Sequence, residues 1–290
     1  MNDSVQAGLL NWDFPPFVCA TLVLVTVIYI RGWLRIRRTR PAQFPAWRLV
    51  CFLAGVVSLV VAVASPLDTM SEQLLFMHMG QHFVLMSVAP PLIVFAAPVV
   101  PMLRGLPRWF VRPVLGPLLR TSWLRSFFHG LVSLRAAWLL MNVSYMAWHI
   151  PAAYEFALSS ENWHNCEHAC FFFSSLLFWW PIIEPWPSRF QNSRWFLIPY
   201  LLTADIVNTI ISASLVFAGK VLYPSYAAQP RAFDISVLSD QAAAGAFMWV
   251  AGSTVFLVPA FMITMEMLSN RGPFSHGPRS QRAPRVHSTL

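Results

Sequence analysis

The chain has 290 residues, of which 57% are hydrophobic and only 11% are charged. Soluble domains carry about 25% charged residues, so this composition excludes a soluble domain and indicates an integral membrane protein. The net charge of +8 could suggest nucleic acid, but the basic residues lie between apolar stretches, beginning at Arg31, and favour a membrane with no nucleic-acid partner.

Seven apolar stretches are long enough to cross a bilayer as helices, which takes about 20 residues each. In chain order they cover residues 15–34, 48–66, 72–98, 129–150, 163–183, 195–217 and 239–267. The first has no basic residue before it, so we expect it to stay in the mature protein rather than be cleaved as a signal peptide. The sequence therefore predicts an all-α integral membrane protein, a seven-helix transmembrane bundle over residues 1–268.

The lysines and arginines between these stretches predict the orientation. Most of them follow the first, third and fifth spans or lie in the tail, and only Lys220 and Arg231 lie between the sixth and seventh spans. The positive-inside rule places the N-terminus outside and the C-terminus in the cytoplasm. Residues 269–290 are rich in Pro, Ser, Gly and Arg, and we expect a disordered basic cytoplasmic tail. The basic segment 99–126 fits either the inner membrane surface or a solvated loop.

Two histidine pairs interrupt the apolar spans. His78 and His82 belong to HMGQH in the third span, and His164 and His168 belong to HNCEH at the start of the fifth. Residues four apart share one face of a helix, and polar side chains in a membrane turn toward the bundle interior. With the predicted orientation, both pairs lie in the outer leaflet, where His149 also closes the fourth span.

Two histidines at positions i and i+4 can hold one metal ion from one helix face. Imidazole with thioether suits copper, especially Cu(I), whereas imidazole with carboxylate suits zinc, Cu(II) or iron. The alternative is a set of hydrogen-bonded structural histidines. The candidate metal ligands are His78, His82, His149, His164, His168, Glu167, Asp240, Met79 and Met248.

The same polar residues allow other interpretations, namely a zinc protease, a haem site or an ion route. HNCEH also matches the motif of inverted zinc proteases, but it starts a membrane span and its partner motif carries Gln81 in place of the glutamate, so we do not expect an enzyme. A membrane cytochrome would need one histidine from each side of a haem, which the two pairs could supply together. Asp205, in the middle of the sixth span, fits either a hydrogen-bonded neutral carboxyl or an ion route.

Three separated motifs resemble a known family. HMGQHFVLMSVAPPL, WHIPAAYEFAL followed by HNCEHACFFFSSLLFWWP, and DQAAAGAFMW occur in order between His78 and Trp249. They resemble the CtaG-type cytochrome c oxidase assembly factors, which are seven-span bacterial membrane proteins. The resemblance implies that the family's acidic positions correspond to Glu167 and Asp240. It implies that the family's histidines correspond to His78, His82, His149, His164 and His168.

The resemblance implies a function in the bacterial inner (plasma) membrane. We expect an assembly factor for a haem–copper cytochrome c oxidase that binds copper, as Cu(I), and helps deliver it. Its partners would be the catalytic subunit of the oxidase or an assembly intermediate, membrane lipid and a periplasmic copper donor. A haem-binding electron carrier and a copper transporter are the alternatives.

Overall fold

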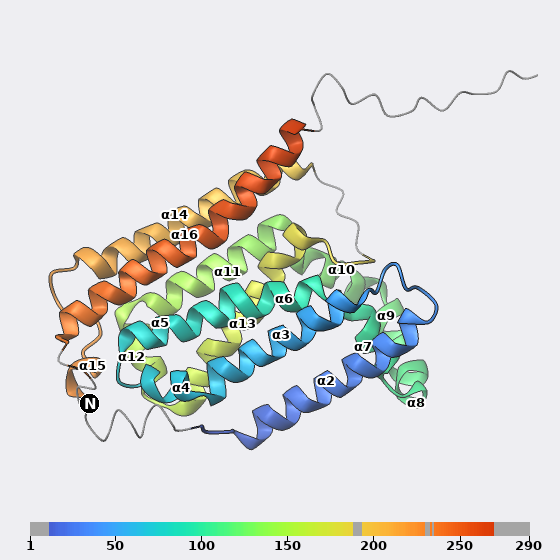
Figure 1. Ribbon diagram of the computed structural model, residues 1–290, viewed down its shortest axis with the longest axis horizontal. Coiled ribbons are helices and arrows are strands. Elements are labelled where there is room, and N and C mark those ends of the chain that lie inside the picture. The colour runs from blue at the N-terminus through green and yellow to red at the C-terminus, as the bar shows by residue number, and fades with distance from the viewer. Residues whose placement is uncertain (1–11, 188–192, 230–232, 234, 270–290) are drawn as a thin grey trace, which may run out of the picture.

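In a computed structural model, every regular element of the described residues is a helix (Figure 1). The structure describes residues 12–187, 193–229, 233 and 235–269. The longest helices are α2 (Pro16–Arg37), α3 (Ala46–Ala64), α11 (Leu134–His149), α13 (Glu161–Ile183), α14 (Leu197–Phe217) and α16 (Val237–Ser269). The predicted all-α class is confirmed, whereas the predicted tail lies, apart from Ser269, outside the described residues.

Within the described residues, six helical segments are long and apolar enough to cross a membrane. They are Pro16–Arg37, Ala46–Ala64, Leu75–Phe95, Glu161–Ile183, Arg194–Phe217 and Val237–Ser269. These match six of the seven predicted spans to within a few residues. The remaining prediction, 129–150, covers α11, which has 16 residues, and the end of α10 (Ser122–Leu131). Because α11 is shorter than the roughly 20 residues of a full crossing, the seventh span stays a prediction.

The third span is composite. It consists of α5 (Leu75–Phe83), a π-helical turn η1 (Val84–Val88) and α6 (Ala89–Phe95). In η1 the amide of Ala89 donates to the carbonyl of Val84, a wide turn of the kind that occurs singly inside α-helices. Pro90 and Pro91 follow it and supply no amide donors. The segment remains one continuous helical path, with both histidines of HMGQH on α5.

Three short helices gather at one end of the bundle: α4 (Pro66–Ser71), α12 (Pro151–Leu158) and α15 (Ser225–Ala228), at the left of Figure 1. Proline starts two of them. Pro66 follows Ser65, whose hydroxyl accepts a hydrogen bond from the amide of Leu67 at 3.1 Å, so Ser65 caps α4. Pro151 disfavours helical geometry at Ile150, which ends α11 at His149.

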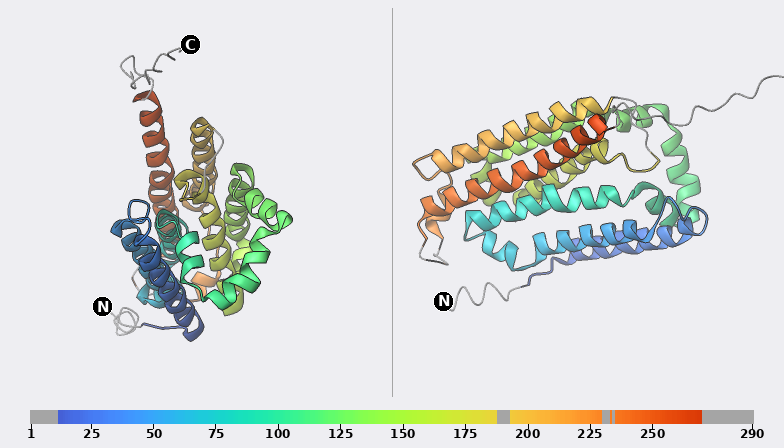
Figure 2. Two further views of the ribbon diagram at one scale, coloured as in Figure 1. Left: turned by 90° about the vertical axis from the view of Figure 1, so that its right-hand side faces the viewer. Right: turned by 45° about the horizontal axis from the view of Figure 1, so that its top comes forward.

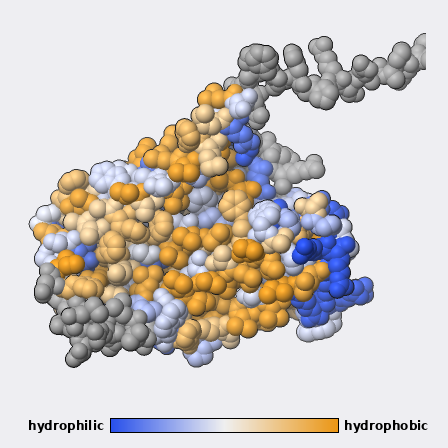
Figure 3. Space-filling model, in the orientation of Figure 1, coloured by the Kyte–Doolittle hydropathy of each residue, from blue (hydrophilic) through white to orange (hydrophobic). Residues whose placement is uncertain are grey.

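The opposite end is basic. It holds α7 (Val99–Gly105), α8 (Arg108–Phe110), η2 (Val111–Leu115), α9 (Gly116–Arg120) and α10. Hydrophilic residues gather there, while a hydrophobic band covers the side of the bundle (Figure 3). The arginines of this end are all exposed: Arg104, Arg108, Arg112, Arg120 and Arg125. Trp109 and Trp123 are exposed beside them, so this segment combines the aromatic and basic side chains of a membrane-surface element.

The two views of Figure 2 agree with Figure 1 in placing α14 and α16 on one side of the bundle and α2 on the other. Small residues let α14 and α16 approach closely. A Cβ atom at Gly245 would lie 2.8 Å from the carbonyl oxygen of Ser212, and one at Gly252 would lie 2.7 Å from the Asn208 side chain. Because glycine alone leaves this space, the two helices form a tight wall beside α5, α11 and α13.

Candidate metal centre

The five predicted histidines converge near the end of the bundle that holds α4, α12 and α15. His78 and His82 come from α5, His149 from the end of α11, and His164 and His168 from α13. The ring centroids of His78 and His82 lie 4.3 Å apart, and those of His78 and His164 lie 5.1 Å apart. The ring of His149 lies 6.2 Å from that of His82.

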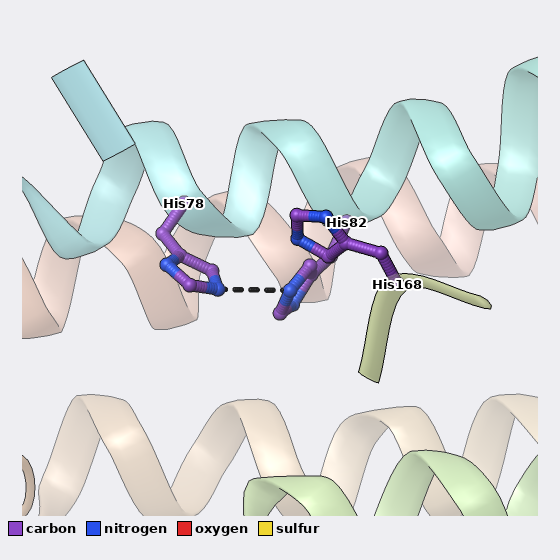
Figure 4. Close-up of side chains that lie close together, drawn as sticks. All are labelled: His78, His82 and His168. Atoms are coloured by element: carbon purple, nitrogen blue, oxygen red, sulfur yellow. Dashed lines mark hydrogen bonds between the residues drawn. The ribbon is translucent and has the colours of Figure 1, made fainter. Parts of the chain in front are cut away.

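The closest nitrogens belong to α5. Nε2 of His78 lies 2.8 Å from Nε2 of His82, and His168 approaches both from α13 (Figure 4). One ligand atom from each of these three histidines lies within 4.8 Å of the other two. The same limit holds for His78, His164 and Glu167. The structure therefore contains two overlapping sets of three donors, with His78 in common.

Several donors of the cluster have no hydrogen-bond partner within the described part of the chain. These are Nε2 of His164, Nε2 of His168 and both carboxylate oxygens of Glu167. The nearest basic group to Glu167 is Nε2 of His82, at 3.8 Å. Buried polar atoms are normally hydrogen-bonded, and a carboxylate is especially costly to bury alone. A metal ion would satisfy these donors together, because imidazole nitrogen and carboxylate oxygen both ligate metals.

Two imidazoles are oriented by a hydrogen bond at Nδ1, which leaves Nε2 for a metal ion. Nδ1 of His149 lies 2.7 Å from the carbonyl oxygen of Tyr145. A carbonyl only accepts, so Nδ1 carries the proton and Nε2 keeps its lone pair. Nδ1 of His78 lies 2.9 Å from the hydroxyl of Tyr226. Such outer partners set the tautomer and orientation of a metal-binding histidine.

A tyrosine pair closes the cluster toward the end of the bundle. The hydroxyl of Tyr226 on α15 lies 2.9 Å from the hydroxyl of Tyr154 on α12, and it donates to the carbonyl of Ser71 at 3.1 Å. Burial raises the pKa of the Tyr226 hydroxyl well above its usual range, so this group stays protonated as a hydrogen-bond donor. His78 and Glu167 are fully buried, and His164 is half-buried. Access to the cluster is therefore most direct at His164.

Asp240 does not join either set of three donors. Its carboxylate accepts hydrogen bonds from the amides of Leu75 at 2.8 Å and Phe76 at 3.1 Å. These amides start α5 and have no partner within their own helix. Asp240 thus caps the helix that carries His78 and His82, and its role as a metal ligand stays a prediction.

Met79 and Met248 lie near His82 at a small cavity. Together with His82 and His149 they line a cavity of about 40 Å³. The two predicted methionine ligands therefore lie at the cavity that borders the histidine cluster.

Gln81 connects α5 to its neighbours rather than to an imidazole. Its amide nitrogen donates to the carbonyl of Ala62 at 2.8 Å and to Oδ1 of Asp68 at 2.6 Å. Sequence reasoning missed Asp68, Tyr154 and Tyr226, because all three lie outside the predicted spans, although Tyr154 belongs to the motif WHIPAAYEFAL. Chain position did offer one weak signal, since the loops that contain them flank the histidine-bearing ends of the spans.

Comparison with known proteins identifies the family. The family model described as cytochrome c oxidase caa3 assembly factor (Caa3_CtaG) matches residues 27–270, which include all five histidines. The chain belongs to this family. The predicted family resemblance is thus confirmed.

Curated relatives of this family member come from mycobacteria. An uncharacterized protein of Mycobacterium leprae (strain TN) is 25% identical over 256 residues, which are 83% of this chain and 37% of the relative. An uncharacterized protein of Mycobacterium bovis (strain ATCC BAA-935 / AF2122/97) is 27% identical over 198 residues, 64% of this chain and 29% of the relative. The chain thus spans about a third of the length of these relatives. No solved structure gives a significant match.

Proposed function

We propose that this assembly factor binds copper as cargo at the histidine cluster and helps deliver it to the catalytic subunit of a haem–copper oxidase. The supporting observation is the group of five buried or half-buried imidazoles beside Glu167, in which several donors have no hydrogen-bond partner among the residues that the structure describes. Imidazole nitrogens suit copper among the first-row metals. The family of oxidase assembly factors and the imidazole donor set both favour copper as the bound ion.

The overlap of the donor sets favours transfer over storage. His78 belongs to both sets, so an ion can exchange one partner for another without leaving the cluster. A closed four-ligand site, in contrast, holds its ion tightly as a structural element. The half-buried His164 offers the route by which a periplasmic donor could supply the ion and the oxidase subunit could receive it.

The orientation follows from the charges. The exposed arginines of α7–α10 face the cytoplasm under the positive-inside rule, and the histidine cluster then lies toward the outside, near the periplasm. With α11 as a seventh crossing, the N-terminus is outside and the C-terminus inside. The membrane is the bacterial plasma membrane, where the oxidase subunit meets the lipid-facing helices of the assembly factor.

The test is the metal content of the protein purified in detergent after loading with Cu(I). Three variants are compared with the wild type: His78→Ala with His82→Ala, His164→Ala with His168→Ala, and His129→Ala as a control. His129 is exposed on α10 at the opposite end. The wild type and control should retain the copper bound at the histidine cluster, and each double variant should hold at least one copper ion fewer. Undiminished copper in both double variants would refute the proposal.

A cellular measurement tests delivery. A strain that lacks the protein should lose oxidase activity at limiting copper and regain it with the wild type but not with either double variant. Full oxidase activity in the deletion strain at limiting copper would contradict a role in delivery. The two measurements separate binding of copper from its transfer.

The two alternatives have their own signatures. A haem carrier would show a Soret band, but the cavity beside the histidines is only about 40 Å³, which disfavours a haem there. A copper transporter would load vesicles with copper in the absence of any oxidase. Asp205 is the residue that supports transport, since one of its carboxylate oxygens is buried within α14 without a hydrogen-bond partner among the described residues.

A further inference from the structure

A second cluster of metal-binding side chains lies beside the histidine cluster. The cavity of about 40 Å³ is lined by Met79, Met86, Met141 and Met248 together with His82 and His149. These residues come from α5, η1, α11 and α16. The four methionines are each no more than 6% exposed. Four elements thus bring thioethers to one small space, on the side of His82 away from the tyrosine pair.

His149 supplies the polar donor of this space. It is 6% exposed, and its Nε2 has no hydrogen-bond partner among the residues that the structure describes. It is absent from both donor sets formed by the other histidines and Glu167. His149 therefore lines the methionine-lined cavity at the edge of the histidine cluster, where its ring lies 6.2 Å from that of His82.

One chain of hydrogen bonds holds His149 and Met248 in place. Nδ1 of His149 donates to the carbonyl of Tyr145, and the hydroxyl of Tyr145 donates to Oδ1 of Asn208 at 2.9 Å. The amide nitrogen of Asn208 then donates to the carbonyl of Met248 at 3.3 Å. The helices that carry the imidazole and one thioether are thus connected across the cavity, as expected of a preorganised site.

Methionine often serves as flexible core filler, and a filled core would explain buried thioethers without any ligand. The cavity argues against that explanation here. Its volume exceeds the roughly 10–15 Å³ that a single water needs, so the methionines leave space next to an uncommitted imidazole. Thioether and imidazole donors together select a soft ion such as Cu(I) over harder divalent ions.

We propose that the methionine-lined cavity is a second metal site, selective for a soft monovalent ion, with His82 as the wall that it shares with the histidine cluster. The physiological ion is Cu(I), and this assignment rests on the proposed function in copper delivery. The histidine cluster with Glu167 accepts borderline divalent ions as well, whereas the cavity does not. An ion bound at His82 can therefore pass between the nitrogen and oxygen ligands of the histidine cluster and the softer sulfur ligands of the cavity.

The experiment compares Ag(I), a soft ion that does not change oxidation state in the assay, with Zn(II). Bound metal per protein is measured by equilibrium dialysis and elemental analysis, and silver–sulfur scattering by X-ray absorption. The four cysteines are replaced by alanine in every sample, because thiols also bind Ag(I). The wild-type cavity should take up one Ag(I) with sulfur ligands in addition to any ion at the histidine cluster, and Zn(II) should bind at the histidine cluster alone.

The decisive variant is Met86→Leu with Met141→Leu, which nearly conserves side-chain volume. It should lose one Ag(I) and the sulfur scattering while retaining Zn(II). The single variant Met248→Leu should also lower the bound Ag(I) and the sulfur scattering, so the test survives if the double variant fails to fold. The control is Met262→Leu with Met265→Leu, two exposed positions on α16, and it should behave as the wild type.

Two outcomes would overturn the second site: unchanged Ag(I) binding with sulfur ligands in the decisive variants, or no sulfur scattering in the wild type. Failure of the proposed function looks different. If His164→Ala with His168→Ala changes neither Zn(II) nor copper binding while the cavity still takes up Ag(I), the histidine cluster is not the copper site but the second site stands.

Discussion

The hydroxyl of Tyr226 lies 2.9 Å from Nδ1 of His78, although 148 residues separate the two in the chain. The same hydroxyl contacts Tyr154 and Ser71. One side chain on α15 therefore connects α4, α5 and α12 and sets the orientation of the histidine that both donor sets share. Through this contact the short helices become part of the candidate metal centre.

Substitution of this tyrosine should weaken metal binding without abolishing it. Tyr226→Phe removes the hydroxyl and retains the ring, so His78 loses its outer partner. The affinity for copper should fall about 10–100-fold, as measured by competition with a Cu(I) chelator. Tyr200→Phe is the control, because it removes a buried hydroxyl that donates to the carbonyl of Phe178, away from the histidines. Equal affinities in the two variants would refute the positioning role of Tyr226.

The cap at Asp240 predicts a change in stability rather than in metal content. Asp240→Ala leaves the amides of Leu75 and Phe76 without their acceptor, which should lower the free energy of unfolding by about 0.5–2 kcal/mol. Asp240→Asn keeps one side-chain oxygen and should lose less. Thermal unfolding in detergent measures the stability, and copper per folded protein should be unchanged. Loss of copper at an unchanged unfolding temperature would instead make Asp240 a ligand.

The buried carboxyl of Asp68 predicts a pH dependence. Burial raises its pKa, and the hydrogen bond from Gln81 opposes that rise only in part. A carboxyl whose pKa is higher in the folded than in the unfolded state stabilises the fold at low pH, and this stabilisation is lost as the pH rises from about 3.9 through the raised value. At neutral pH the buried charge therefore opposes folding.

Asp68→Asn keeps an acceptor oxygen for Gln81 and removes the charge. Its free energy of unfolding relative to wild type should therefore increase as the pH rises above about 3.9, because the wild-type carboxyl then ionises while it is buried. Chemical unfolding in detergent at several pH values measures this. A difference between Asp68→Asn and wild type that stays constant with pH would contradict the prediction.

The close approach of α14 and α16 predicts a sensitive glycine. Gly252→Ala would place a Cβ atom 2.7 Å from Nδ2 of Asn208, so the asparagine must move and its bond from Tyr145 is disturbed. The free energy of unfolding should fall by about 1–3 kcal/mol. Gly130→Ala is the matched control, because nothing lies within 4 Å of its Cβ position. Similar unfolding temperatures for the two variants would show that the helices can separate.

Much of the fold could be predicted from the sequence because its signals are local. A run of about 20 apolar residues needs no tertiary information to be recognised as a span, and six such predictions match helices closely. The predicted span at 129–150 differs from the structure because Ser133 starts a new helix within it, its hydroxyl accepting a hydrogen bond from the amide of Ala136. That break shortens α11, and hydropathy alone does not detect it.

The sequence by itself determined that the chain lies in a membrane and that two histidine pairs each occupy one helix face, because hydropathy and the 3.6-residue period depend on neighbours in the chain. Only the tertiary structure decided which donors remain uncommitted. It assigned Asp240 to the amides of α5, Tyr226 to His78, and His149 to a cavity with four methionines. These partners lie far apart in the sequence, so their pairing depends on how the helices pack.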